Sequence, residues 1–301
     1  MIELKLESAK INEINVKKLV DSNQVSEIIT NLNLLWKKTI KNQFPGPQPI
    51  SIERKHFKHL KTDKYYVANK NDGERYCLVF VQYEDHYLSA LLSRTNNLYL
   101  INIRASKKCY EGTIIDGELV NNMFYAFDTP LICGLDVHTY AFSNRMEQIG
   151  IFERCIKRWP KTFNFITKEF ISLENIKTLK ENNKCDGLIF MPETAIVSVG
   201  THNKMFKWKP LELNTIDFLY KKGKVFLQTA GELTEKRIKI ETNGFQIDPN
   251  ENTIVECIYL HDKHWQVLKI RDDKLMPNSV HTYTRTLVNI SENILINEFY
   301  D

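Results

Sequence analysis

Short apolar runs separated by polar turns dominate the chain from about residue 65 onward. The runs are rich in β-branched and aromatic residues and have the length of strands, so they predict a β-rich protein. They are YYVAN, RYCLVFVQY, YLSALLS, LYLIN, TIIDGELV, MFYAFD, GLIFMP and MFKWKP, followed after about residue 215 by TIDFLYKKGKVFLQT, KRIKIET, TIVECIYL and HWQVLKIR. The later strands are short and evenly spaced, which is typical of a small β-barrel.

Helical spacing of apolar residues is confined to a few segments. It predicts helices over Val25–Ile40, Arg145–Lys157 and Lys168–Asn183, and a closing helix over Ser279–Ile294. The segment Phe44–Ser51, FPGPQPIS, holds three prolines and a glycine, which predict irregular structure there.

These elements predict an α+β protein. We expect an N-terminal extension over residues 1–40 and a domain of antiparallel sheets with helices over 41–214. A small β-barrel domain with its closing helix is expected over 215–301.

The composition fits a globular protein that acts inside the cell. Hydrophobic residues make up 43% and charged residues 26% of the 301 residues. No apolar run approaches the ~20 residues of a membrane span, and MIELKLES carries charges where a secretory signal would be apolar. We therefore expect no membrane partner and a cytoplasmic location. The net charge of +4 is compatible with a polyanionic partner without requiring one.

The six cysteines form no CxxC pair. A zinc site with that spacing is not expected, and a reduced, disulfide-free protein is.

The first chemical signal is KNDGER, in which Lys70 ends a predicted strand and Arg75 begins the next. A lysine held in such a turn can act as a nucleophile, and a nearby arginine suits phosphate or ribose oxygens. The plainer interpretation is a charged turn between two strands.

Two further signals are single residues in apolar strands. Glu118 in TIIDGELV is either an outward-facing side chain or a carboxylate directed at a ribose hydroxyl or a metal. Phe127 in FYAFD either packs in the core or stacks on a base.

Three more signals follow along the chain. Asp186 precedes an apolar strand, as a turn residue or as an oxygen ligand of a divalent cation. Lys207 and Lys209 in MFKWKP share one strand face, either solvated or bound to a phosphate. The segment RDDK, with Arg271 and Lys274, leaves a strand of the small β-rich region.

Taken together and in this order, the motifs KxDGxR, DGE, FD, DG, KxKP and RxDK resemble those of the covalent nucleotidyltransferases, the superfamily of capping enzymes and polynucleotide ligases. The resemblance covers roughly residues 40–290. Phe44–Arg54, Leu213–Phe218, the segment IVECIY and the segment RDDKLMPN are similar to the guanylyltransferase branch that caps mRNA. Asn71 departs from that pattern, which usually has a small or hydroxyl residue after the lysine.

The resemblance implies a nucleotidyltransferase domain followed by an OB-fold, and it assigns roles to residues. Lys70 would attack GTP and carry GMP, which is then transferred to the 5′-diphosphate end of an RNA to form a GpppN cap. Arg75 and Glu118 would hold the ribose, and Phe127 would stack on guanine.

The remaining implied roles concern the guanine edge, the phosphates and the metal. Lys168 would donate to guanine O6, which only accepts hydrogen bonds. Lys207 and Lys209 would contact the α-phosphate. The β- and γ-phosphates would be oriented by Arg271, Asp273 and Lys274 when the domains close. Asp186, with Glu118 as a second candidate, would hold Mg²⁺ or Mn²⁺.

Capping also needs an RNA triphosphatase and a guanine-N7 methyltransferase, and no stretch beside these motifs is long enough for either. Both are expected on other chains or on other domains of a longer protein. The abundance of Asn, Ile and Lys suggests an AT-rich genome, such as that of a large DNA virus. Two other functions stay open at this point, an ATP-dependent RNA or DNA ligase and a noncatalytic capping scaffold.

Overall fold

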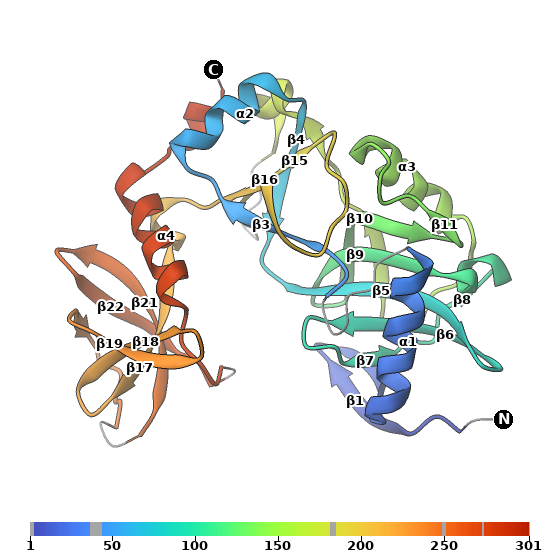
Figure 1. The fold of residues 1–301 in the computed structure, drawn as a ribbon, viewed down its shortest axis with the longest axis horizontal. Helices are drawn as coiled ribbons and strands as arrows, with labels where there is room; N and C mark the ends of the chain where they lie inside the picture. The colour runs from blue at the N-terminus through green and yellow to red at the C-terminus, as the bar shows by residue number, and fades with distance from the viewer. Residues whose placement is uncertain (1–2, 37–43, 181–184, 249–250, 273, 301) are drawn as a thin grey trace. The chain divides into compact units, whose positions relative to one another are not determined.

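A computed structural model describes residues 3–36, 44–180, 185–248, 251–272 and 274–300. The chain forms two compact units (Figure 1). The first comprises Met1–Ile50 and His59–Lys207, and the second comprises Ser51–Lys58 and Trp208–Asp301. The N-terminal segment, expected as an extension, thus belongs to the first unit, because its strands join that unit's large sheet.

The large sheet of the first unit has nine strands. Their order is β1 (Leu6–Ile11), β2 (Ile14–Leu19), β7 (Leu98–Leu100), β6 (His86–Ser93), β5 (Glu74–Tyr83), β9 (Thr113–Val120), β10 (Met123–Ile132) and β11 (Leu135–Asp136). The ninth strand, β13 (Asn164–Thr167), pairs in parallel with β10, whereas the other pairings are antiparallel.

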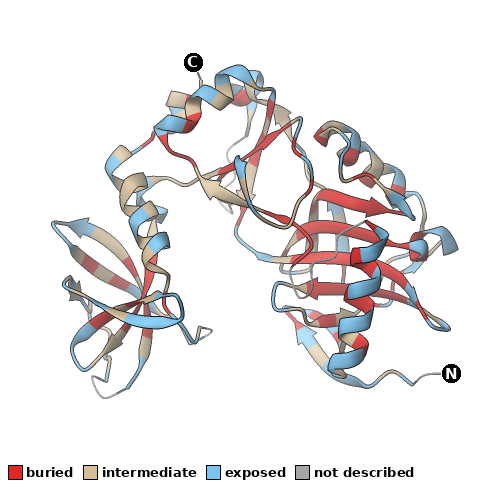
Figure 2. Ribbon diagram, in the orientation of Figure 1, coloured by how far each residue is buried: buried red, intermediate tan, exposed pale blue. Residues whose placement is uncertain are grey.

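Both faces of this sheet are covered, which explains why its central strands are apolar at consecutive positions. Along β5, Leu78 and Phe80 enter one core cluster, while Val79 and Val81 enter another. Helix α3 (Phe142–Glu153) packs on the first cluster, and helix α1 (Ser22–Leu35) packs on the second. Figure 2 shows this burial in the middle strands.

A second sheet of the first unit carries five strands in the order β14 (Ile171–Ser172), β4 (Tyr65–Asn71), β15 (Cys185–Pro192), β16 (Gly200–Trp208) and β3 (Pro47–Ser51). The irregular structure predicted for Phe44–Ser51 is wrong over β3. Proline lacks a backbone N–H, but β3 is the edge strand, where a missing donor can face away from the ladder.

The helix predicted over Lys168–Asn183 is also wrong over the described part of that range. The chain there forms the short strand β14 and the 3₁₀ helix η3 (Leu173–Thr178). β14 pairs with β4, so sheet hydrogen bonds replace the expected helical ones. The helices predicted over Val25–Ile40 and Arg145–Lys157 are present as α1 and α3 with shifted ends, and residues 37–43 lie outside the described part.

The short elements of the chain complete this description. They are β8 (Arg104–Ala105), paired with β12 (Ile156–Arg158), together with α2 (Phe57–Thr62), η1 (Arg54–His56), η2 (Lys107–Glu111), η4 (Leu211–Leu213) and η5 (Ile296–Phe299).

The second unit is built on a six-stranded sheet in the order β19 (Glu232–Lys236), β18 (Lys224–Thr229), β17 (Thr215–Lys221), β21 (Thr253–His261), β22 (His264–Ile270) and β20 (Lys239–Glu241). Helix α4 (Val280–Glu292) follows, and its N-cap Ser279 accepts a hydrogen bond from the Thr282 backbone N–H, as the predicted closing helix requires. Tyr283 and Leu287 of α4 pack on the core around Phe218 and Trp265. The predicted α+β class is confirmed, with an OB-like second domain.

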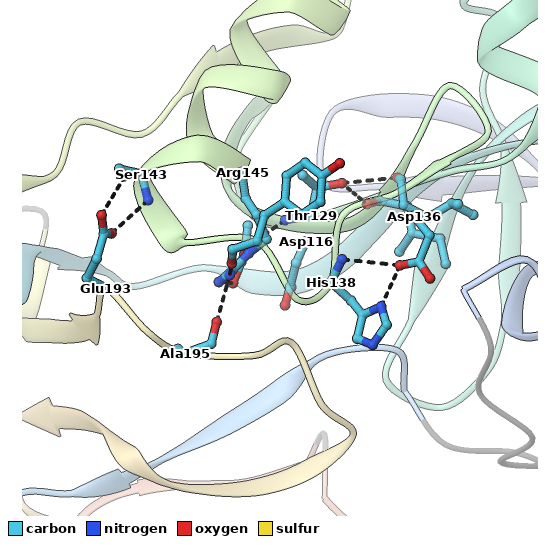
Figure 3. Close-up of polar contacts among 12 residues, drawn as sticks. Asp116, Thr129, Asp136, His138, Ser143, Arg145, Glu193 and Ala195 are labelled. Carbon is cyan, nitrogen blue, oxygen red and sulfur yellow. Dashed lines mark hydrogen bonds and ion pairs between the residues drawn. The ribbon is translucent and has the colours of Figure 1, made fainter.

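Helix α3 ties the two sheets of the first unit together. Phe142 packs with Met191 and Met205 of the five-stranded sheet, whereas the C-terminal half of α3 packs on the large sheet. Ser143 donates from its N–H and its hydroxyl to the carboxylate of Glu193, at 3.0 and 2.7 Å (Figure 3).

At the centre of this junction Arg145 is completely buried. It donates two hydrogen bonds to the carboxylate of Asp128 on β10, at 2.6 and 2.9 Å. It also donates to the carbonyl of Ala195 at 2.6 Å, from the loop after β15 (Figure 3). The pair has side-chain exposures of 0% and 1%, so removal of either partner leaves an uncompensated charge out of water.

Replacement of Arg145 by Met, similar in length but uncharged, should therefore destabilise the first unit by about 3–5 kcal/mol. Chemical denaturation, monitored by a signal from the first unit, measures the change in its free energy of unfolding. The control is Lys204→Met, because Lys204 pairs with Asp63 at the surface and solvent replaces that contact. Equal, small shifts for both variants would contradict a structural role for the buried pair.

Candidate active site

Lys70 lies near the end of β4, and its amine contacts a carboxylate on the adjacent strand. Lys70 Nζ donates to Asp186 Oδ1 at 2.6 Å. Asp186 reaches this position because the pairing of β15 with β4 is irregular between Cys185 and Leu188. Gly187 within the irregularity has φ of 148°, which a side chain rarely permits. The two side chains are 19% and 12% exposed, so the amine is sheltered but reachable.

Lys168 brings a second amine to the same place. It follows β13, where its backbone N–H donates to the carbonyl of Ala126 on β10 at 2.8 Å. Its Nζ donates to Asn71 Oδ1 at 2.6 Å, and Lys70 Nζ donates to the carbonyl of the same Asn71 at 3.4 Å. Burial lowers the pKa of Lys168 to about 8, although nearby Glu118 opposes the shift.

Glu118 lies close to both amines and to the turn at Gly73. It occupies β9 opposite Arg75 of β5 and Tyr125 of β10. The backbone N–H of Gly73 donates to Glu118 Oε1 at 3.3 Å. Burial raises the pKa of Glu118, whereas the charges of Lys70 and Lys168 lower it. A half-buried carboxylate flanked by two amines is an unusual arrangement for a purely structural strand.

The glycine before Glu118 is required by packing. A Cβ on Gly117 would lie 2.3 Å from the ring of Phe124 on the paired strand. Any side chain there would push β9 and β10 apart and move Glu118 with them.

Arg75 is held by contacts within the protein. Its Nε donates to Asp116 Oδ1 at 2.9 Å, and its Nη2 donates to the carbonyl of Pro47 at 2.7 Å. The guanidinium lies 5.0 Å from the ring centre of Phe44 and 5.5 Å from that of Phe127, within cation–π range. The structure thus brings Arg75 and Phe127 together, and two of the arginine's nitrogens are engaged by the protein itself.

Asp116 was not singled out from the sequence. It is 1% exposed and stands two residues before Glu118, on the same face of β9. The motif DGE contained this signal, since a buried carboxylate on an apolar strand normally needs a charged or hydrogen-bonding partner. Asp116 positions Arg75, while Glu118 stays near the amines.

The two later lysines fall at the division of the chain. Lys207 lies on β16 and ends the first unit, whereas Lys209 follows the strand and belongs to the second. Both side chains are half-buried. Their predicted approach to a phosphate stays a prediction.

The last predicted cluster lies in the second unit. Arg271 Nη1 donates to Asp217 Oδ1 and to Glu256 Oε2, each at 3.2 Å, and Lys274 pairs with the same Asp217. Asp217 is the second residue that sequence reasoning missed, although an aspartate inside the apolar strand TIDFLY was a visible signal. Asp273 lies outside the described residues.

A lysine near a strand end beside a carboxylate, a second buried lysine close to it and a following OB-like domain are the parts of a nucleotidyltransferase. The family model of the mRNA capping enzyme catalytic domain matches residues 7–211, and that of the mRNA capping enzyme C-terminal domain matches residues 220–300. The chain belongs to the mRNA capping enzyme family, and its activity is that of an mRNA guanylyltransferase.

Curated relatives agree with this assignment. The mRNA-capping enzyme subunit alpha of Schizosaccharomyces pombe is 29% identical over 323 residues, covering 85% of this chain and 79% of that protein. The mRNA-capping enzyme of Caenorhabditis elegans is 25% identical over 332 residues, covering 93% of this chain and 52% of that protein. These relatives come from a fungus and an animal, so they give no support to the predicted viral source.

Solved structures of ligases resemble the fold only distantly. The structure described as mycobacterial DNA ligase D complexed with ATP and MES has a TM-score of 0.41 and 11% identity, over 77% of this chain and 95% of that chain. A likeness at this level carries no argument about activity.

Proposed function

We propose that Lys70 is the nucleophile of the guanylyltransferase reaction. The single observation that supports this is its sheltered amine, placed beside Asp186 and within the field of Glu118 and Lys168. Lys70 Nζ gives up a proton and attacks the α-phosphorus of GTP. A P–N bond forms, the P–O bond to the β-phosphate breaks, and pyrophosphate leaves.

In the second step an oxygen of the RNA 5′-diphosphate attacks the same phosphorus. The P–N bond breaks, the lysine amine is released, and a GpppN end results. Both transition states place charge on phosphate oxygens, so fixed cations should supply much of the rate enhancement. Lys207 and Lys209 are the proposed contacts to the α-phosphate. The β- and γ-phosphates are assigned to Arg271, Asp273 and Lys274.

Base and sugar recognition is proposed for the residues around Asn71. Lys168 can donate to guanine O6, which accepts hydrogen bonds only, whereas adenine presents an amino group at the same position. Glu118 can accept from a ribose hydroxyl. Phe127 offers a ring for stacking on the base. Arg75 can donate to the ribose from the guanidinium N–H groups that Asp116 and Pro47 leave free.

A divalent cation fits the carboxylates of this site. Asp186 and Glu118 offer the hard oxygen ligands that Mg²⁺ and Mn²⁺ prefer. Lys70 balances the charge of Asp186 in the free protein, and a bound cation would exchange with this amine at the carboxylate. Such an ion would neutralise phosphate charge during the transfer. The exchange matters for Lys70, because the amine must leave Asp186 and lose its proton before it can attack.

The nucleotide that labels the protein separates this function from its rivals. Incubation with GTP or ATP, each radiolabelled at the α-phosphate, should give label on the denatured chain from GTP alone, and added pyrophosphate should remove it. Label from ATP instead would identify a ligase. A folded protein that takes label from neither nucleotide would be a noncatalytic scaffold.

The depressed pKa of Lys168 makes guanine recognition sensitive to alkaline pH. With a pKa of about 8 the side chain loses most of its charge by about pH 9, so the apparent affinity for GTP should fall about tenfold between pH 7 and pH 9. Lys168→Arg stays protonated throughout and should give a flatter profile. Both proteins bind the same GTP, so ionisation of the nucleotide affects both affinities equally and cancels in the comparison. Parallel pH profiles of GTP affinity would contradict the role of Lys168 in guanine recognition.

The other partners are proposed by chemistry alone. The substrate is a diphosphate-ended RNA, whose precursor needs an RNA triphosphatase and whose product is taken by a guanine-N7 methyltransferase. We place both on other chains or domains, and the words "subunit alpha" in a relative's name are compatible with a partner subunit. No helix among the described residues is long and apolar enough to cross a membrane. A cytoplasmic location and a viral source stay predictions.

A further inference from the structure

Three cysteines from distant parts of the sequence meet in the first unit. The sulfur atoms of Cys109, Cys133 and Cys155 all lie within 4.8 Å of one another. Cys109 is fully buried, and the other two are half-buried. Cys133 lies just after β10, at the end of the sheet where β9 begins, whereas Glu118 lies near the other end of β9, so this cluster is separate from the active site.

The segments that carry the thiols are fixed by backbone hydrogen bonds. Cys109 lies in η2, and its N–H donates to the carbonyl of Ser106 at 3.1 Å. The N–H of Ser106 donates to the carbonyl of Cys155 at 2.9 Å, just before β12 pairs with β8. Gly134, next to Cys133, donates from its N–H to the carbonyl of Gly112 at 2.8 Å. The three sulfurs therefore converge through the fold and not by the chance rotation of free loops.

Cys133 occupies a backbone position where cysteine is an uncommon choice. Cys133 and Gly134 form the two-residue loop between β10 and β11, and both have positive φ, 50° and 76°. Such loops favour Asn, Asp or Gly at the first position, because in the left-handed region the Cβ of most other residues comes too close to the following carbonyl oxygen. The N–H of Cys133 donates to Thr113 Oγ1 at 2.9 Å, and this hydroxyl donates to the carbonyl of Cys109 at 2.9 Å.

We propose that Cys109, Cys133 and Cys155 form a binding site for a thiophilic metal ion, with Zn²⁺ as the natural occupant. The sulfurs of a tetrahedral zinc site lie about 3.8 Å apart, given Zn–S bonds of about 2.3 Å. The separation of Cys133 Sγ from Cys109 Sγ is 3.6 Å, and all three sulfurs lie within 4.8 Å of one another.

The ligand set decides the class of ion. Three thiolates without a carboxylate exclude Mg²⁺ and Ca²⁺ and select soft or borderline ions. A divalent ion leaves one net negative charge in this mostly apolar setting, and a monovalent ion would leave two, so the divalent ion is favoured. Solvent can supply the fourth ligand through the half-buried Cys133 and Cys155. The ion would tie η2, the β10–β11 loop and the start of β12 together.

Cobalt is the probe, because Co²⁺ bound to thiolates absorbs through sulfur-to-metal charge transfer. The whole chain, reduced and stripped of metal, is titrated with Co²⁺ and then with Zn²⁺. We expect one equivalent of Co²⁺ with a charge-transfer band that Zn²⁺ abolishes. Cys133→Ser and Cys155→Ser should each weaken Co²⁺ binding by at least about 100-fold, since loss of a ligand exceeds the cost of losing an outer hydrogen bond.

The controls are Cys185→Ser, beside the active-site Asp186, and Cys257→Ser, buried in the second unit. Both should keep the cobalt band, and circular dichroism confirms that every variant is folded. Absence of the band, or an unchanged band in Cys133→Ser, overturns the proposal. So does a non-reducing peptide map of the unreduced protein that shows a Cys109–Cys133 disulfide. None of these readouts involves GTP, so failure here is distinct from failure of the nucleotidyl transfer.

Discussion

Lys70→Arg should abolish formation of the protein–GMP adduct, lowering its rate by on the order of 10⁴-fold or more. Arginine keeps the positive charge and can keep the ion pair with Asp186. Its guanidinium stays protonated at any workable pH, so it offers no lone pair for attack on the α-phosphorus. The initial rate of labelling from α-labelled GTP measures the loss.

The matched control is Lys64→Arg. Lys64 precedes the same strand, β4, but its side chain is exposed and reaches Glu193 at 3.9 Å. That variant should label at the rate of the unchanged protein. Substantial labelling of Lys70→Arg would show that another side chain carries the nucleotide, because the substitution removes only nucleophilicity.

Asp186→Asn is expected to have the second largest effect, slowing adduct formation by about 10³-fold. The substitution keeps the size of the side chain and one acceptor oxygen but removes the charge that lies 2.6 Å from Lys70 Nζ. It takes away both the anion that orients the amine and the strongest candidate ligand for the divalent cation. The labelling rate should also need a higher concentration of Mg²⁺ or Mn²⁺ to saturate.

Two measurements keep this prediction apart from a general loss of structure. Asp85→Asn, in the exposed turn between β5 and β6, should change neither the labelling rate nor its metal dependence. A thermal melt of Asp186→Asn should stay close to that of the unchanged protein. A slower rate with an unaltered metal requirement would assign Asp186 to Lys70 alone and remove it from the metal site.

Strand positions were predictable because burial on both sheet faces leaves a strong local signal in the sequence. Phe80 and Val81, for example, enter opposite cores and had to be apolar together. The failures arose where a long-range pairing decided the local structure. Residues near Ile171 have helical spacing but pair with β4, and Pro47 sits in an edge strand that tolerates a missing donor.

The motifs indicated which residues to assign to the candidate site, but not which of them contact one another. The motif order suggested Lys70 and Asp186, yet only the pairing of β15 with β4 makes them neighbours. Asp116 and Asp217 were missed although each is an acid in an apolar strand, because the sequence does not show the contacts by which they hold Arg75 and Arg271.

The cysteine cluster was not predicted from the sequence, for a related reason. A rule based on CxxC spacing detects metal sites whose ligands are close in sequence. Cys109, Cys133 and Cys155 are brought together by a hairpin loop and a 3₁₀ helix, so no spacing could have indicated them.

The measurement that tests the central claim most directly is the location of the nucleotide. The protein is incubated with GTP and a divalent cation, digested with trypsin at alkaline pH to protect the phosphoramidate, and analysed by mass spectrometry. A modified Lys70 resists cleavage, so the account predicts one GMP-bearing peptide spanning residues 65–75. GMP on any other residue, or an AMP adduct formed preferentially when both nucleotides are present, would contradict it.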